Sequence, residues 1–257
     1  LFRFIENHYI PQKTVITISG KFNQSKLLKY IQSHIPSQKP TKIEKRIIPI
    51  KKITKPQYLY IKDTAKKLYN VSFRFFSPTI NDNKSMGKIN IINKILSGIG
   101  DLSILKHRLR TKLGSIYSVS TYTEANAYYG IFTISYSIEI HNFVKTMAEI
   151  INILKELKEG LFNPKLIKIA KEKYLLNIKN SLNSNSPTDY YEYANSVLNN
   201  RELYNMQELY DKYVKDVEKN DIVKMSKKIF NKDNIYICAI GPKPLKEDAI
   251  IKTLSNL

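Results

Sequence analysis

Arg110 and Tyr117 are the residues of this chain whose types and spacing point most directly to chemistry. They lie on either side of Gly114, where a predicted helix ends. Arginine offers a planar donor fork that stays charged, and tyrosine offers a hydroxyl on a rigid apolar ring. Together these groups could hold a peptide carbonyl and, in a cleft of low dielectric constant, stabilise an oxyanion formed on it. Taken alone, the same residues also fit a helix C-terminal cation and the first residue of a strand.

The four histidines do not form a metal-binding motif. In zinc peptidases, two ligands share one face of a helix and a glutamate lies between or beside them. No histidine here has a second histidine four residues away, or a glutamate in the helical frame that would complete such a face. The isolated positions are His8, His34, His107 and His141. The chain is therefore predicted to hold no metal ligand.

The chain is strongly basic, with 42 lysines and arginines against 22 acidic residues and a formal net charge of +20. An excess of this size is typical of proteins that bind nucleic acid or an anionic surface. However, only six of the basic residues are arginine, and no nucleic-acid-binding motif accompanies the scattered lysines. We interpret the excess as a lysine surface exposed to solvent and keep a basic nucleic-acid-binding module as a lesser alternative.

Hydrophobic periodicity predicts an α+β fold. Apolar and β-branched residues alternate in six stretches that we interpret as strands. These stretches are residues 13–19, 57–62, 70–76, 117–123, 128–138 and 234–240. Elsewhere apolar residues recur at helical spacing, most regularly from Val144 to Leu157, before Gly160. Strands in groups, with helices gathered after them, favour one mixed or antiparallel sheet with helices packed on one face.

The chain is also predicted to be divided. Prolines interspersed with lysines, without an apolar period, mark a linker at residues 39–56. The linker separates residues 1–38 from a second domain at residues 57–257. A strand, a glycine and a helix follow one another at residues 13–35 and again at residues 234–254. This repeat predicts that the leading piece is the C-terminal segment of a first domain similar to the second.

Several motifs from residue 95 onward give the chain a likeness to a known family. They are Ile95-Leu96-Ser97-Gly98, Leu102-Ser103-Ile104-Leu105, Leu109-Arg110, Gly114-Ser115-Ile116-Tyr117-Ser118-Val119 and Gly130-Ile131-Phe132. Together they resemble the second domain of the pitrilysin/insulinase (inverzincin) zinc metallopeptidases, a group that includes the mitochondrial processing peptidases. The segment from Glu6 to Phe22 is similar to the end of that family's first domain. One departure is Ile104, where the family usually has arginine.

The resemblance implies paired α+β domains that close around a peptide, with the family's His-x-x-Glu-His zinc helix in the first domain. That helix is absent from this sequence, so the chain alone is predicted to be inactive and to carry no catalytic residue. Arg110 and Tyr117 would correspond to the family's substrate-gripping pair. Zn2+ is expected in the full-length protein or in a partner subunit, because in some members the zinc half and the Arg/Tyr half lie on different subunits.

The predicted function is a peptide-binding C-terminal domain of a zinc-dependent metalloendopeptidase. It would position a peptide or unfolded protein for hydrolysis at a zinc site outside this chain. The alternative is a non-catalytic structural or assembly subunit of the same family. No apolar run is long enough to span a membrane and no signal peptide is present, so we expect a soluble protein, intracellular or organellar rather than secreted. Because the chain opens at Leu1 without methionine, we expect it to continue a longer protein.

Overall fold

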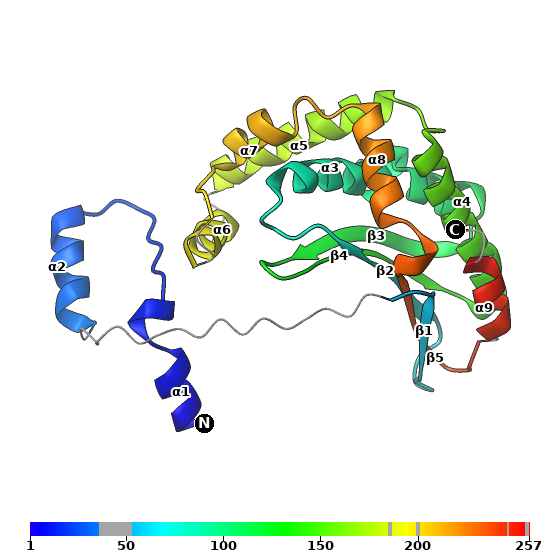
Figure 1. Ribbon diagram of the computed structural model, residues 1–257, viewed down its shortest axis with the longest axis horizontal. Helices are drawn as coiled ribbons and strands as arrows, with labels where there is room; N and C mark the ends of the chain where they lie inside the picture. The colour runs from blue at the N-terminus through cyan, green and yellow to red at the C-terminus, as the bar shows by residue number, and fades with distance from the viewer. Residues whose placement is uncertain (36–52, 185–186, 199–200, 246, 255–256) are drawn as a thin grey trace. The chain divides into compact units, whose positions relative to one another are not determined.

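The computed structural model describes residues 1–35, 53–184, 187–198, 201–245, 247–254 and 257 (Figure 1). Contacts divide the chain into two compact units. One comprises Leu1–Ile47 together with Ile178–Met206. The other comprises Ile48–Asn177 together with Gln207–Leu257, and it contains all the strands of the described residues.

The larger unit is built on one five-stranded sheet with the strand order β1-β5-β2-β4-β3. The strands are β1 (Gln57–Lys62), β2 (Tyr69–Ser77), β3 (Ile116–Ala125), β4 (Gly130–Ile138) and β5 (Ile235–Gly241). β5 pairs in parallel with β1 and antiparallel with β2, and the remaining pairs are antiparallel. The expected mixed sheet is confirmed, and the strand ends differ from the predicted limits by at most two residues.

Alternation along the central strands separates a buried face from an open one. In β2, Tyr69, Val71, Phe73 and Phe75 are buried, and the residues between them are exposed or half-exposed. Register places Phe73 between Ile134 of β4 and Ile237 of β5, and both of these are also buried. Each such side chain contributes about 1.5 to 3 kcal/mol through burial. These rows of apolar residues are therefore the core of the unit.

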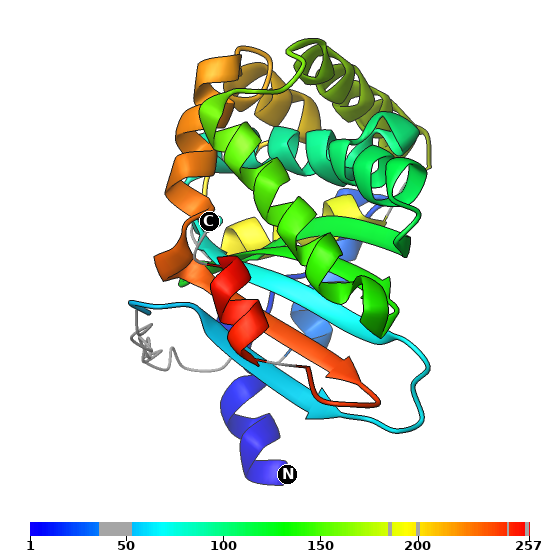
Figure 2. The same cartoon turned by 90° about the vertical axis from the view of Figure 1, so that its right-hand side faces the viewer.

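Helices lie on the buried side of the sheet, as predicted, some against the sheet and others farther from it (Figure 1 and Figure 2). They are α3 (Asn83–Asn93), α4 (Phe143–Glu159), α5 (Lys165–Ser184), α7 (Met206–Tyr213), α8 (Lys219–Ile229) and α9 (Glu247–Leu254). α4 buries an apolar stripe that includes Met147, Ile150 and Leu154, at helical spacing. It ends at Gly160, whose φ of +75° is the left-handed conformation that closes many helices.

Several short helical segments connect the longer elements of this unit. Two of them are π-helical, η2 (Lys94–Gly98) and η4 (Lys106–Lys112), and they lie between α3 and β3. The others are the 3-10 turns η3 (Gly100–Leu102), η5 (Ile140–Asn142) and η6 (Lys232–Asn234). A π-helix is rare and is found frequently at functional sites. The segment that leads into β3 is therefore the most irregular part of this unit.

The smaller unit contains helices but no strand among its described residues. Its elements are α1 (Phe2–His8), η1 (Pro11–Lys13), α2 (Gln24–His34) and α6 (Pro187–Leu198), together with the end of α5. The strand predicted at residues 13–19 was wrong, because residues 14–19 pair with no strand among the residues that the structure describes, and a strand depends on a partner. Ser19 and Tyr190 share a hydrogen bond of 2.5 Å between their hydroxyls. Residues 39–52 of the predicted linker lie outside the described residues.

Candidate functional site

Two arginines of η4 lie in opposite surroundings. Arg108 is partly buried and reaches α4, where its Nε donates to Glu149 Oε1 at 2.5 Å and its Nη1 donates to Glu156 Oε2. Burial by itself would lower the pKa of Arg108, but its hydrogen bonds to Glu156 and Glu149 outweigh burial and raise that pKa. Arg110 is exposed, and within the described part of the chain its guanidinium makes no ion pair. Arg110 is thus the arginine of η4 whose donors are open to a ligand.

The turn after η4 is held by hydrogen bonds from within and from α4. Gly114 has a φ of +57°, which favours glycine, and its N–H donates to the carbonyl of Arg110 at 3.1 Å. Ser115 is buried, and both its N–H and its hydroxyl donate to the carbonyl of Leu109. Thr146 of α4 donates its hydroxyl to Ser115 Oγ at 2.9 Å. The backbone that follows Arg110 is fixed by these contacts.

Tyr117 lies in a β-bulge at the start of β3. Ile116 and Val119 pair with residues two positions apart on β4, so Tyr117 and Ser118 both stand opposite Ser137. Because Ile116 and Val119 are both buried on the helix-covered face, the bulge leaves Tyr117 and Ser118 on the open face. Tyr117 is 84% exposed. A regular strand would instead have turned Val119 toward the open face, so the bulge is what allows Tyr117 to be exposed and Val119 to be buried.

The open face of the sheet has a polar half and an apolar half. On β2, β4 and β3 its residues are small and polar near the bulge, and Ser137 donates its hydroxyl to Asn70 Oδ1 at 2.9 Å. These polar residues are Asn70, Ser72, Ser118, Ser120, Ser135 and Ser137. On β1 and β5 the open face carries Leu59, Ile61, Cys238 and Ile240, all exposed or half-exposed. Tyr117 therefore belongs to the polar half.

Side chains of the helical layer contact the edge strand β3. Ser97 of η2 accepts a hydrogen bond from the backbone N–H of Thr121 at 2.8 Å, and the two hydroxyls are also 2.8 Å apart. Asn93 of α3 donates its side-chain amide to Thr123 Oγ1 at 2.9 Å. The backbone amide of Thr121 is thus already bonded. Strand addition along this edge would have to break the contact with Ser97.

Arg110 and Tyr117 are both placed on the surface, on either side of the same turn. No hydrogen bond joins their side chains within the described part of the chain. Sequence patterns did not reveal the fork of Arg108 or the contact between Ser115 and Thr146, because both join residues more than 30 positions apart. The bulge had a local signal that was not used. Ile116 and Val119 are three residues apart, which breaks the alternation of a regular strand.

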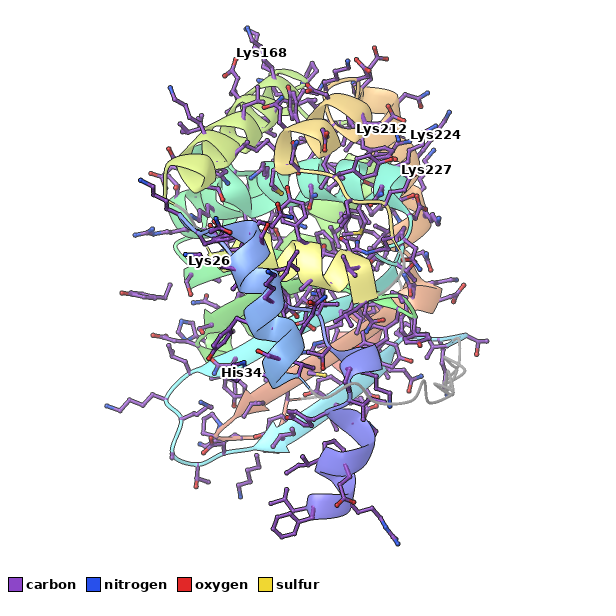
Figure 3. All side chains as sticks on the ribbon, turned by 90° about the vertical axis from the view of Figure 1, so that its left-hand side faces the viewer. Lys26, His34, Lys168, Lys212, Lys224 and Lys227 are labelled. Atoms are coloured by element: carbon purple, nitrogen blue, oxygen red, sulfur yellow. The ribbon has the colours of Figure 1, made fainter. Side chains whose placement is uncertain are left out.

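The four histidines and many of the described lysines are exposed at the surface. His34 stacks on Tyr30 at the end of α2, with ring centroids 4.0 Å apart, and His141 lies 3.3 Å from Glu139. Figure 3 shows Lys168, Lys224 and Lys227 extending away from the helices that carry them. Among the described residues, no three histidine, cysteine or acidic side chains are grouped so that they could hold a metal ion. These residues do not fit a zinc site.

Comparison with known families assigns this α+β domain to a family. The model of the peptidase M16 inactive domain matches residues 1–174. The chain belongs to this family. The match confirms the membership predicted from the motifs between residues 95 and 132, and it identifies the chain as the C-terminal domain of a two-domain M16 unit. An M16 inactive domain is consistent with a non-catalytic role for the chain.

Solved structures share the fold of this M16 domain. A chain of complex III2 from Candida albicans, with Inz-5 bound, aligns with a TM-score of 0.80 and 18% identity over 98% of this chain and 61% of that chain. The first half of the periplasmic protease PqqL from Escherichia coli aligns with a TM-score of 0.73 and 14% identity, over 91% of this chain and 53% of that chain. A protease from Helicobacter pylori aligns with a TM-score of 0.69 and 17% identity, over 87% of this chain and 53% of that chain. At these identities the likeness shows the fold alone.

The chain spans about half to three fifths of the length of these solved chains. A comparison with curated proteins finds no match. In the residues that the structure describes, no helix combines the length and the apolar character needed to cross a membrane.

Proposed function

We propose that this M16 inactive domain binds peptide or unfolded protein and positions it for hydrolysis at a zinc site outside this chain. The observation that carries the proposal is the placement of Arg110 and Tyr117, both exposed and both on backbone of unusual geometry. A π-helix holds the arginine and a β-bulge holds the tyrosine. Such irregularities are found preferentially beside binding and active sites.

The chemistry of the pair suits a peptide carbonyl. Arg110 supplies up to five N–H donors in a planar fork and Tyr117 supplies one hydroxyl, and both can donate to an oxygen. The serine hydroxyls and the Asn70 side-chain amide of the polar half extend this donor and acceptor surface across β4 and β2. A peptide with its backbone extended presents carbonyl and N–H groups at a spacing that such a surface can accept.

Zinc is expected in the full-length protein or in a partner subunit and not on the residues described here. When bound in its own domain, zinc would supply the activated water that hydrolysis requires. This chain would contribute orientation of the substrate, through Arg110 and Tyr117. Residues 1–38 would form the C-terminal segment of the first domain, and residues 57–257 would form the second. Support for that division comes from the greater length of the relatives and from the recurrence, in the sequence, of alternating apolar residues, a glycine and an amphipathic helix.

A peptide-binding experiment tests the proposal. The probe is a fluorescein-labelled, unstructured peptide of about 15 residues with zero net charge, so that the basic surface does not attract it. Arg110→Ala and Tyr117→Phe should each weaken binding about tenfold or more and leave the unfolding temperature unchanged. Lys112→Ala, two residues from Arg110, and Tyr128→Phe, in the turn at the opposite end of β3, are control variants at exposed residues, and each should change the affinity less than twofold. Equal effects of site and control variants would refute the proposal.

A second candidate function is that of a non-catalytic assembly subunit. The observation that favours it is the alignment with a chain of complex III2, which covers 98% of this chain. An assembly subunit should tolerate Arg110→Ala and Tyr117→Phe, and it should migrate in a stable complex with a partner chain on size-exclusion chromatography. A zinc-bearing first domain supplied in trans separates the two functions, because only the peptidase function predicts turnover that depends on Arg110.

A further inference from the structure

α4 makes two separate side-chain contacts with the segment that carries Arg110 and Tyr117. The first is the fork from Arg108 to Glu149 and Glu156, and the second is the hydrogen bond from Thr146 to Ser115. We infer that α4 sets the positions of Arg110 and Tyr117 through these contacts, so that Arg108 and Ser115 are positioning residues. The inference rests on the proposed function wherever peptide binding is the measurement.

The segment needs external support because its own backbone is irregular. In η4 the N–H of Leu113 donates to the carbonyl of Arg108 at 3.1 Å, five residues earlier, which is the wide spacing of a π-helix. The N–H of Ser115 donates to the carbonyl of Leu109, which is six residues earlier. Regular i to i−4 hydrogen bonds would stabilise a different path. The observed path persists only if contacts from elsewhere favour it.

The Arg108 contact is well suited to hold η4 against α4. Arg108 has 22% of its side chain exposed, and the figures for Glu149 and Glu156 are 23% and 30%. The two carboxylates are seven residues apart on one face of α4, and Asn152 donates to the other oxygen of Glu156 at 3.0 Å. A planar guanidinium bonded at two nitrogens has a defined orientation, which a single lysine ammonium would not have.

The Ser115 contact fixes the other end of the turn. Thr146 is fully buried and Ser115 is 6% exposed, so their hydrogen bond is shielded from water. Ser115 in turn donates a hydrogen bond from its hydroxyl to the carbonyl of Leu109 at 3.2 Å. The path from α4 through Ser115 therefore reaches the backbone of η4. Arg110 lies between the two supported points, and Tyr117 lies two residues beyond the second.

An ion pair elsewhere in the same unit provides a matched control. Lys88 of α3 and Asp221 of α8 are 2.6 Å apart, with exposed side-chain fractions of 18% and 31%. This pair resembles the Arg108 contact in burial and also joins two helices, but neither helix carries Arg110 or Tyr117. Lys88→Met should therefore reproduce the loss of a helix-joining ion pair without moving the binding pair.

The test measures binding of the same neutral peptide and amide hydrogen exchange in the full chain. Arg108→Met should weaken binding about fivefold and Thr146→Val about threefold, whereas Thr146→Ser, which keeps the hydroxyl, should restore affinity to within twofold. Exchange of the amides from Gly114 to Ser118 should become at least about tenfold faster in Arg108→Met and stay unchanged in Lys88→Met.

The outcomes separate the two proposals. If Arg110→Ala weakens binding but Arg108→Met behaves like Lys88→Met in both measurements, the positioning role is wrong and the binding function stands. If exchange accelerates as expected but no variant alters binding, α4 does support the segment and the proposed function fails. Thr146→Val is nearly isosteric with the native residue, so it keeps the test decisive even if Arg108→Met does not fold.

Discussion

Residues 14–35 and the segment from β5 to α9 carry the same pattern of alternating residues, a glycine and an amphipathic helix, yet only the second forms a strand. When Gly20 is aligned with Gly241, Ile16 and Ile18 correspond to Ile237 and Ala239. Ile237 and Ala239 are almost fully buried, whereas Ile16 and Ile18 are 49% and 43% exposed. The difference lies in pairing partners. β5 has β1 and β2 on its two sides, whereas residues 14–19 pair with no strand in the described part of the chain.

The pattern specifies a strand only where neighbouring strands supply hydrogen bonds and a face to cover. The helices that follow behave in the same way. α9 buries Ile250 and Leu254, and α2 buries none of its residues. α2 nevertheless has a complete N-cap, in which Asn23 accepts a hydrogen bond from the N–H of Lys26 at 3.0 Å. Local signals are therefore sufficient for a helix and insufficient for a strand.

The largest expected effect comes from placing an amide at the two corresponding isoleucines. Ile237→Asn buries an unsatisfied polar group and leaves a gap in the core, so it should lower the free energy of unfolding by about 3 to 5 kcal/mol. Ile16→Asn should change it by less than about 0.5 kcal/mol. Urea unfolding followed by circular dichroism measures both. Equal losses would show that residues 14–19 are packed as tightly as β5.

The two corresponding glycines provide the next test. A Cβ on Gly241 would lie 2.3 Å from Cδ1 of Tyr69, whereas a Cβ on Gly20 would meet nothing within 4 Å. Gly241→Ala should cost about 1 to 3 kcal/mol through overpacking of a ring that is 1% exposed. Gly20 has a φ of +136°, so Gly20→Ala is strained locally, but it should leave the main unfolding transition in place. If Gly20→Ala lowered the stability of the main unfolding transition as much as Gly241→Ala, this account would be contradicted.

The smallest effect appears only at high pH and concerns the strand beside β5. Tyr58 of β1 pairs with Ile237, and its hydroxyl is buried without a partner among the described residues. Burial raises the pKa of Tyr58 to about 12, so its stabilising contribution is complete below pH 10 and is lost as the pH rises toward 12. Tyr58→Phe should flatten the decline of unfolding free energy between pH 10 and 12. Tyr9→Phe, at a position that is 75% exposed, is the control and should leave the decline unchanged.

The fold was predictable where hydrophobic periodicity and partners agree. The strand at 57–62 was placed correctly, and the helix from Val144 to Leu157 with its closing Gly160 lies within α4 and its cap. The π-helical form of η4 could not be read from the sequence, because its apolar spacing fits an ordinary helix equally well. The contact from Arg108 to α4 could not be predicted either, since nothing in the local sequence indicates which of the two arginines of η4 will form ion pairs with carboxylates.

The assignment of Arg110 and Tyr117 came from the family resemblance and stays a prediction. The structure adds the two features that distinguish these residues from their neighbours, namely the open donors of Arg110 and the exposure of Tyr117 in the bulge. Both depend on contacts with α4 and β4, which are distant in the sequence. Residue type and spacing alone could not have separated Arg110 from Arg108.

The hydrogen bond between Ser97 and Thr121 has a consequence for how copies of this chain meet at high concentration. Free edge strands recruit one another, and the resulting stacks grow into aggregates. With the Thr121 amide already bonded, strand addition on the β3 side must first break the contact with Ser97, so we expect a second copy to pair more readily at β1, the other terminal strand of the sheet. Self-association would then use the edge of the sheet remote from Tyr117. Copies that associate in a concentrated solution would therefore still have Tyr117 exposed.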